Sequence, residues 1–160
     1  MALAAHDRMM WKRHSHGEQN CFPIVDVDEQ DIDAVIYTLP IGGYLCVNLD
    51  VDALDPSEMP AVIGPASGEL TYRQAVAIIE KTCSRCRVVG FSLAELYPFL
   101  DTNGFSALTA GRLNCNAMDR IARQQRMKGG VGNRTTRDWT LLPFTIVRLN
   151  TEEPVDTMFI

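Results

Sequence analysis

The sequence lacks a long apolar run, an excess of basic charge and an even, dense set of cysteines. No stretch approaches the ~20 apolar residues that a membrane-spanning helix needs. The net charge of -5 provides no basic field that would recruit nucleic acid or anionic lipid. The five cysteines are odd in number and scattered, unlike the bridges of small secreted domains. We therefore expect a soluble protein of a reducing compartment, cytoplasmic or mitochondrial, with neither a membrane span nor a nucleic-acid partner.

What the sequence does contain is typical of one globular domain. Its 160 residues are 46% apolar, which excludes wholesale disorder and provides for a sizeable core. Three expected helices and two expected strands alternate along the chain: helix 28–39, strand 44–49, a helix from Thr71, strand 87–93 and helix 105–126. Nearly continuous apolar strands between helices predict an α/β fold with parallel strands and right-handed crossovers.

Composition divides the chain into three segments. Residues 1–21 show no clear period, and we expect an irregular N-terminal segment there. Residues 22–126 carry the α/β pattern. Residues 127–160 begin with a glycine-rich linker and continue into an apolar segment, in which we expect one more strand between Trp139 and Leu149.

Acidic residues follow both expected strands. Asp50 and Asp52 come after the first strand, and Glu95 comes after the second. In open α/β sheets, ligands bind beyond the carboxyl ends of the strands. Two aspartates at i and i+2 on an extended chain point the same way, and their repulsion favours a bound cation or a shared proton. Mn, Mg or Ca would suit such oxygen ligands. The alternative is that these acids cap the following helices or line a solvated rim.

The residues around these acids resemble a known family. Leu49–Pro56 reads LDVDALDP, which is similar to the signature of the ureohydrolases, the arginases, agmatinases and formimidoylglutamases. The resemblance covers roughly Phe22 to Arg123. The stretch Leu70-Thr71-Tyr72-Arg73 is most similar to arginases. The other matching residues are Pro60-Ala61, Pro65, Gly68, Ala94-Glu95-Leu96-Tyr97-Pro98 and Ala107-Leu108-Thr109-Ala110.

This resemblance implies a fold, a reaction and residue roles. The fold is a three-layer α/β/α sandwich around a mostly parallel sheet. The reaction is hydrolysis of a guanidino C–N bond by a hydroxide held between two Mn ions, with release of urea in the arginase and agmatinase branches. By position, Asp50 and Asp52 are implied to be catalytic metal ligands. Glu95 is implied to be catalytic and to bind the substrate guanidinium.

Most of the family's metal ligands have no counterpart in this chain. Four of the six ligands belong to upstream segments of the GGDHS and DAHxD type, and neither segment is present. We expect His6, His14 and His16 to lie on a solvated N-terminus rather than to bind metal. The chain is then a fragment or half of a split enzyme truncated at its N-terminal side, or a catalytically inactive structural or regulatory subunit.

Four further features carry smaller expectations. Ile63-Gly64 stands where arginases have a Gly-Thr pair, and Glu69 stands where a second glycine is usual; we expect Glu69 to be a solvated loop acid. Cys83-Ser84-Arg85-Cys86 is interpreted as structural rather than redox or zinc-binding. The basic stretch Arg120–Arg137 is interpreted as a solvated helix end followed by a linker. A partial sheet would also leave an open edge, which predicts a homo-oligomer or a partner protein that covers it.

Overall fold

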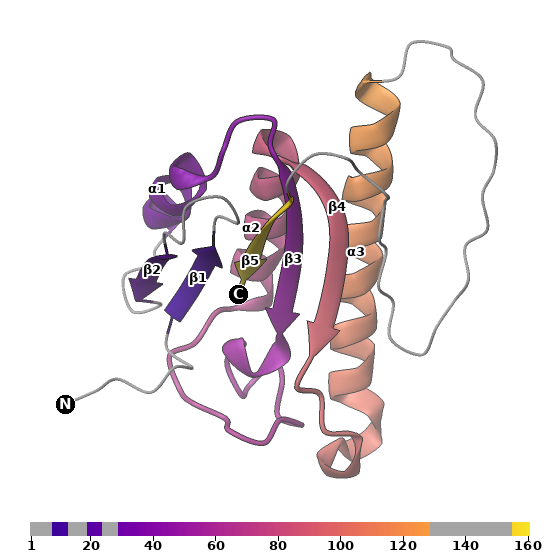
Figure 1. The fold of residues 1–160 in the computed structure, drawn as a ribbon. Helices are drawn as coiled ribbons and strands as arrows, with labels where there is room; N and C mark the ends of the chain where they lie inside the picture. Colours follow the sequence, from indigo (N-terminus) through magenta and orange to yellow (C-terminus); the bar gives the residue numbers. More distant parts are fainter. Residues whose placement is uncertain (1–7, 13–18, 24–28, 129–154) are drawn as a thin grey trace.

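The computed structural model describes residues 8–12, 19–23, 29–128 and 155–160. These residues form a five-stranded sheet in the order β2-β1-β5-β3-β4 (Figure 1). The strands are β1 Arg8–Lys12, β2 Gln19–Pro23, β3 Tyr44–Asp50, β4 Arg87–Ala94 and β5 Val155–Phe159. The helices are α1 Glu29–Thr38, α2 Tyr72–Arg85 and α3 Phe105–Lys128, with short 3-10 turns η2 Val51–Ala53, η3 Pro98–Leu100 and η4 Thr102–Gly104.

The centre of the sheet is parallel, as the sequence predicts. β3 pairs in parallel with β4, and α2 makes the crossover between them. Burial alternates along β3: Leu45, Val47 and Leu49 are buried, whereas the residues between them are half-buried. The predicted α/β architecture with parallel strands is confirmed.

The three helices pack on one face of this sheet. Ile32 of α1, Ile78 of α2 and Leu113 of α3 belong to the same buried cluster as Leu45 and Val47. α2 contacts both α1 and α3, and in Figure 1 α2 lies behind β3 and β5, with α1 to its left and α3 to its right. The described residues therefore contribute one helical layer of the expected three-layer sandwich.

Two side-chain hydrogen bonds join β3 and β4 on the opposite face. The Ser92 hydroxyl on β4 donates a hydrogen bond to Asn48 Oδ1 on β3. At the other end of the pair, Arg87 Nη1 donates to the Tyr44 hydroxyl at 3.2 Å. These contacts join the two strands near both ends of their parallel pairing.

Local signals in the sequence set the start of α2. Thr71 caps the helix: its backbone N–H donates to Gln74 Oε1 at 2.8 Å, and its hydroxyl accepts the Gln74 backbone N–H at 3.3 Å. This reciprocal pair is a capping box, which satisfies two donors that would otherwise lack partners. The predicted N-cap at Thr71 is confirmed.

The N-terminal segment differs from the irregular segment expected over residues 1–21. Arg8–Lys12 and Gln19–Pro23 form the antiparallel pair β1–β2, and β1 continues the sheet by pairing with β5. Each strand has only five residues. Such short strands are fixed by partners distant in sequence and leave no detectable period in the sequence.

β5 was not predicted either. It lies between β1 and β3 and runs parallel to β3, so it closes the edge of β3 that faces away from β4. The strand expected between Trp139 and Leu149 lies outside the described residues. Within the described part of the chain, β4 pairs with β3 alone.

The Cys83–Cys86 pair lies inside the fold. Both cysteines are buried, and the Cys86 thiol donates to the Pro40 carbonyl at 3.2 Å. Desolvation by burial raises the pKa of Cys83 to about 12. A thiol so seldom ionised is a poor nucleophile and metal ligand, which agrees with a structural role.

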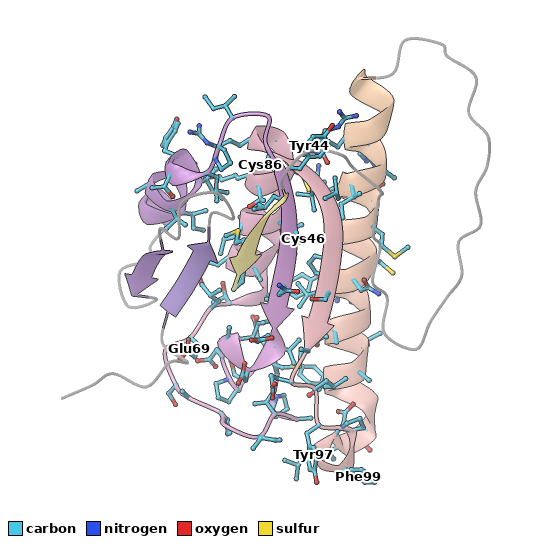
Figure 2. The ribbon with its side chains drawn as sticks, viewed as in Figure 1. Tyr44, Cys46, Glu69, Cys86, Tyr97 and Phe99 are labelled. Atoms are coloured by element: carbon cyan, nitrogen blue, oxygen red, sulfur yellow. The ribbon has the colours of Figure 1, made fainter. Side chains whose placement is uncertain are left out.

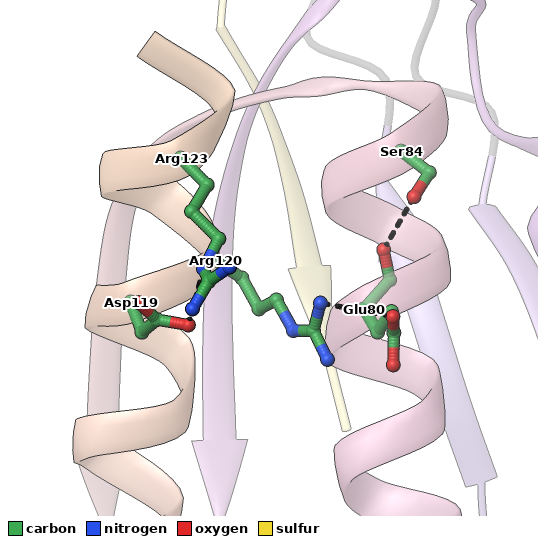
Figure 3. Close-up of polar contacts among 5 residues, drawn as sticks. All are labelled: Glu80, Ser84, Asp119, Arg120 and Arg123. Atoms are coloured by element: carbon green, nitrogen blue, oxygen red, sulfur yellow. Dashed lines mark hydrogen bonds and ion pairs between the residues drawn. The ribbon is translucent and has the colours of Figure 1, made fainter. Parts of the chain in front are cut away.

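The first arginines of the basic stretch pair with acids on the helical face. Arg120 of α3 contacts Glu80 of α2 at 3.0 Å, and Arg123 contacts Asp119 one turn earlier at 2.7 Å (Figure 3). Arg134 and Arg137 lie outside the described residues. None of the helices that the structure describes is long and apolar enough to cross a membrane.

Candidate functional site

The predicted site residues lie at one edge of the sheet. Asp50 is the last residue of β3, Asp52 follows it in η2, and Glu95 directly follows β4. The register pairs Asp50 with Ala94, so Glu95 follows at the same edge as Asp50 and Asp52. The expected placement of these acids at the carboxyl ends of adjacent parallel strands is confirmed. Their roles in catalysis and metal binding stay predictions.

The chain around Asp50 and Asp52 is firmly anchored. Val51 and Ala53, which flank Asp52, are buried, and this holds η2 against the core. The Asp50 backbone N–H donates to the Ile160 carbonyl at 3.0 Å, and the Ile160 N–H donates to the Asn48 carbonyl at 2.9 Å. The segment that carries both aspartates is therefore fixed on each side by backbone contacts and burial.

Asp55 closes the loop that follows the site, a role that sequence reasoning missed. Its carboxylate accepts the Ser57 N–H at 2.9 Å and the Gly68 N–H at 3.2 Å, so it joins the two ends of the loop. Its backbone N–H donates to the Leu70 carbonyl at 2.9 Å. An aspartate before proline at the start of a turn is the available signal, because Asp side chains bond the backbone two residues on.

The Asp55 carboxylate predicts a pH-dependent stability. Hydrogen bonds from the Ser57 side chain, the Ser57 backbone and the Gly68 backbone hold the pKa of Asp55 below its ordinary value of 3.8. A depressed pKa stabilises the fold above the unfolded-state value, and this stabilisation is lost as the pH falls through the folded-state pKa. We expect Asp55→Asn to be less stable than wild type near neutral pH, with a difference that shrinks below about pH 4.

Urea unfolding at a series of pH values measures this difference. Asp119→Asn is the control, because Asp119 is in an exposed pair with Arg123, which should contribute little at any pH. A difference for Asp55→Asn that stays constant down to the lowest pH would contradict the assignment.

Glu95 has an unusual backbone conformation. Its φ is +65°, in the left-handed region that costs a non-glycine residue about 1–2 kcal/mol. Strained residues of this kind concentrate at functional sites, where the surrounding structure holds them. Here the next residues are held by a bridge between Leu96 and Val62 and by the Tyr97 N–H, which donates to the Ala61 carbonyl at 2.8 Å.

Replacing Glu95 by glycine should therefore stabilise the fold. Glycine removes the left-handed strain but adds freedom to the unfolded chain, so we expect the free energy of unfolding to rise by about 0.5 kcal/mol. Ala94→Gly, one residue earlier on the extended strand, should lower it by about 0.5–1 kcal/mol. Urea unfolding of both variants gives the two signs, and a loss of stability in Glu95→Gly would show that the carboxylate makes a stabilising contact.

Acidic residues outnumber basic ones at this end of the molecule, where Arg73 and Arg112 directly follow the two acidic segments. Segments 50–72 and 94–111 contain aspartates and glutamates but no lysine, arginine or histidine. Three of these acids accept hydrogen bonds from the backbone: Asp55 as described above, Asp101 from the Ser106 and Ala107 N–H groups, each at 2.9 Å, and Glu58 from the Tyr72 N–H. The surplus of carboxylates favours a cation here, whether a metal ion, a guanidinium or a basic partner.

The described residues do not complete a metal centre. Oxygen ligands such as Asp50 and Asp52 suit manganese. In the part of the chain that the structure describes, however, no group of three or more His, Cys, Asp or Glu side chains is arranged to hold a metal ion. His6, His14 and His16 lie outside that part. A metal site that includes Asp50 and Asp52 would therefore need further ligands.

The loop positions that depart from the arginase pattern have different environments. Ile63 is 70% exposed, so its bulky side chain meets solvent at the rim of the site. Glu69 was expected to be a solvated loop acid, but it is only half-exposed, and one carboxylate oxygen is shielded from solvent. Figure 2 shows Glu69, Tyr97 and Phe99 toward the end of the molecule to which β3 and β4 point.

Comparisons with known proteins agree with this geometry. A model of the arginase family matches residues 4–119. The arginase of Brucella melitensis is 43% identical over 83 residues, which are 49% of this chain and 27% of the relative. The N(1)-aminopropylagmatine ureohydrolase of Thermus thermophilus is 45% identical over 58 residues, which are 36% of this chain and 20% of the relative.

A solved structure shows the same fold in part. The proclavaminate amidino hydrolase of Streptomyces clavuligerus aligns with a TM-score of 0.54 and 24% identity, over 60% of this chain and 31% of that one. The matched part is thus less than a third of the length of each of these relatives. The family model starts upstream of Phe22, where the sequence resemblance begins, and spans both β3 and β4 with their acids. The chain belongs to the arginase family.

Proposed function

We propose that this chain supplies the carboxylate side of the active site of a manganese-dependent ureohydrolase. The enzyme would hydrolyse a guanidino C–N bond of an arginine- or agmatine-type substrate and release urea. The observation that carries the proposal is the position of Asp50, Asp52 and Glu95 at the carboxyl edge of adjacent parallel strands, within the segment that the arginase family model matches.

Each acid has a proposed role. Asp50 and Asp52 would be oxygen ligands to manganese, and they need further ligands from residues outside the described part of the chain. Glu95 would accept hydrogen bonds from the substrate guanidinium in a charge-assisted, bidentate contact. Segments 50–72 and 94–111 are rich in carboxylates, and with the adjoining Arg73 and Arg112 an excess of negative charge remains, which supports a cationic substrate.

The isolated chain should bind manganese weakly and release no urea above background. Each missing anionic or imidazole ligand weakens a metal site steeply, and two aspartates cannot hold a bridged metal pair. The second candidate function, a catalytically inactive structural or regulatory subunit, is supported by the same incomplete ligand set. The compartment, cytoplasmic or mitochondrial, stays a prediction of the sequence.

Urea release distinguishes the two functions. The chain is assayed with arginine and with agmatine in the presence of Mn²⁺, alone and after co-expression with the part of the Brucella arginase that lies outside the matched residues. The enzyme proposal expects turnover only in the joint preparation, and its loss in Asp52→Asn. A stable joint complex without turnover would favour the inactive subunit, and turnover that persists in Asp52→Asn would contradict the assigned role of Asp52.

A further inference from the structure

Large apolar side chains are exposed around the acidic edge of the sheet. We call this surface the apolar rim; it comprises Ile63, Tyr97, Phe99, Leu100, Phe105 and Leu108, whose exposures run from 40% for Tyr97 to 89% for Phe99. Figure 2 places Tyr97 and Phe99 at the end of the molecule to which β3 and β4 point. Exposed large apolar side chains that gather at one end of a molecule can mark an interaction site.

The apolar rim is a preformed surface built from three segments. The Tyr97 N–H donates to the Ala61 carbonyl at 2.8 Å, which holds the loop after β4 beside the loop that carries Ile63. The Ala61 N–H donates to the buried Ser106 hydroxyl at 3.1 Å, which holds that loop against the start of α3. The rings of Tyr97 and Phe99 lie 5.7 Å apart. A partner would therefore meet a surface whose backbone is already ordered.

Charge indicates what kind of partner fits the rim. Glu95 lies two residues from Tyr97, and Asp50 and Asp52 lie at the same edge of the sheet. Arg112, one helical turn after Leu108, lies over the Tyr72 ring at 5.4 Å, and the acids still outnumber the basic residues around the rim. A second copy of this chain would bring like charges together, which is destabilising. A polypeptide with lysine, arginine or histidine next to an apolar surface would be complementary.

We infer that the apolar rim is the docking surface for the polypeptide that completes the active site, one that presents apolar side chains together with basic or imidazole groups. For the partner's role, the inference rests on the proposed function. The matched part of this chain is only 27% of the Brucella arginase, so most of that relative lies outside the match, and the two aspartates need additional ligands. A polypeptide seated on the rim would lie directly beside Glu95 and could supply them.

The test uses the full chain and the Brucella arginase fragment outside the matched residues as the probe. The two are co-expressed with a tag on the full chain, and the complex is measured by co-purification and light scattering. Phe99→Ser and Leu108→Ser alter exposed rim positions, and Ile41→Ser is the matched control, since Ile41 is 83% exposed near the amino end of β3. We expect a 1:1 complex for wild type and the control, and a loss of at least about tenfold in affinity for each rim variant.

Three results would overturn the inference. The first is equal binding by wild type and Phe99→Ser. The second is the absence of any complex with the fragment, and the third is a homodimer of the chain that Phe99→Ser dissociates. Circular dichroism melts show whether each variant is folded. A complex that depends on the rim but releases no urea would reject the proposed function and leave the docking surface intact. Urea release by the joint preparation that is unchanged in Phe99→Ser would support the proposed function and reject the rim as the docking surface.

Discussion

Leu113→Ala should lower the free energy of unfolding by about 2–5 kcal/mol. Leu113 is fully buried, and it belongs to the same cluster as Ile78 of α2 and Phe91 of β4. Removing its side chain opens a cavity where α3 meets the rest of the core, and the surrounding elements can close it only in part. Since a domain of this size has about 5–15 kcal/mol in total, the variant should lose a large share of its stability.

The same substitution on the same helix provides the control. Leu108 is 63% exposed, and its truncation to alanine should change the free energy of unfolding by less than about 0.5 kcal/mol. Urea unfolding with a common slope for the three proteins measures both effects. Equal losses in the two variants would mean that α3 does not pack on the sheet through Leu113.

Gln124→Ala should cost about 2–3 kcal/mol, although Gln124 is a polar residue on a helix surface. Its side-chain amide donates to the Cys83 carbonyl at 3.0 Å and to the Cys86 carbonyl, and its oxygen accepts the Val88 N–H at 3.2 Å. One side chain thus joins α3 to the end of α2 and the start of β4. Without it, half-buried backbone groups at this junction lose their partners.

The neighbouring residue separates this effect from the loss of any long polar side chain. Arg123 pairs only with the exposed Asp119, and Arg123→Ala should cost no more than about 1 kcal/mol. Hydrogen exchange provides a second readout, because the Val88 amide should exchange faster in Gln124→Ala than in wild type. Unchanged protection of Val88 would show that the amide has another partner in solution.

Local chemistry made the central elements predictable. Thr71 and Gln74 form the capping box that their spacing indicates, and the apolar runs of β3 and β4 end at the acids that define the site. These features depend on residues that are close together along the chain, so one amino-acid sequence is enough to predict them. The same holds for Asp50, Asp52 and Glu95, because parallel strands necessarily place their carboxyl ends together.

Features that depend on distant partners escaped prediction. β5 has five residues and is fixed by pairing with β3, more than a hundred positions earlier in the chain. The Asp55 carboxylate reaches Gly68, and nothing near Asp55 in the sequence identifies that partner. The exposure of Tyr97 and Phe99 is likewise set by the folded loop and has no local signal in the sequence. In each case a tertiary contact, rather than a local preference, decides the outcome.

The place of β5 in the sheet has a consequence for synthesis in the cell. β5 follows every other described element in chain order, yet it lies in the middle of the sheet, between β1 and β3. A nascent chain can form the β3–α2–β4 unit early, but the N-terminal strands cannot join that unit until β5 leaves the ribosome. Until then the apolar strand β3 has an unpaired edge that other nascent chains can bind. Translation rate and chaperone supply should therefore determine how much of this protein is recovered soluble.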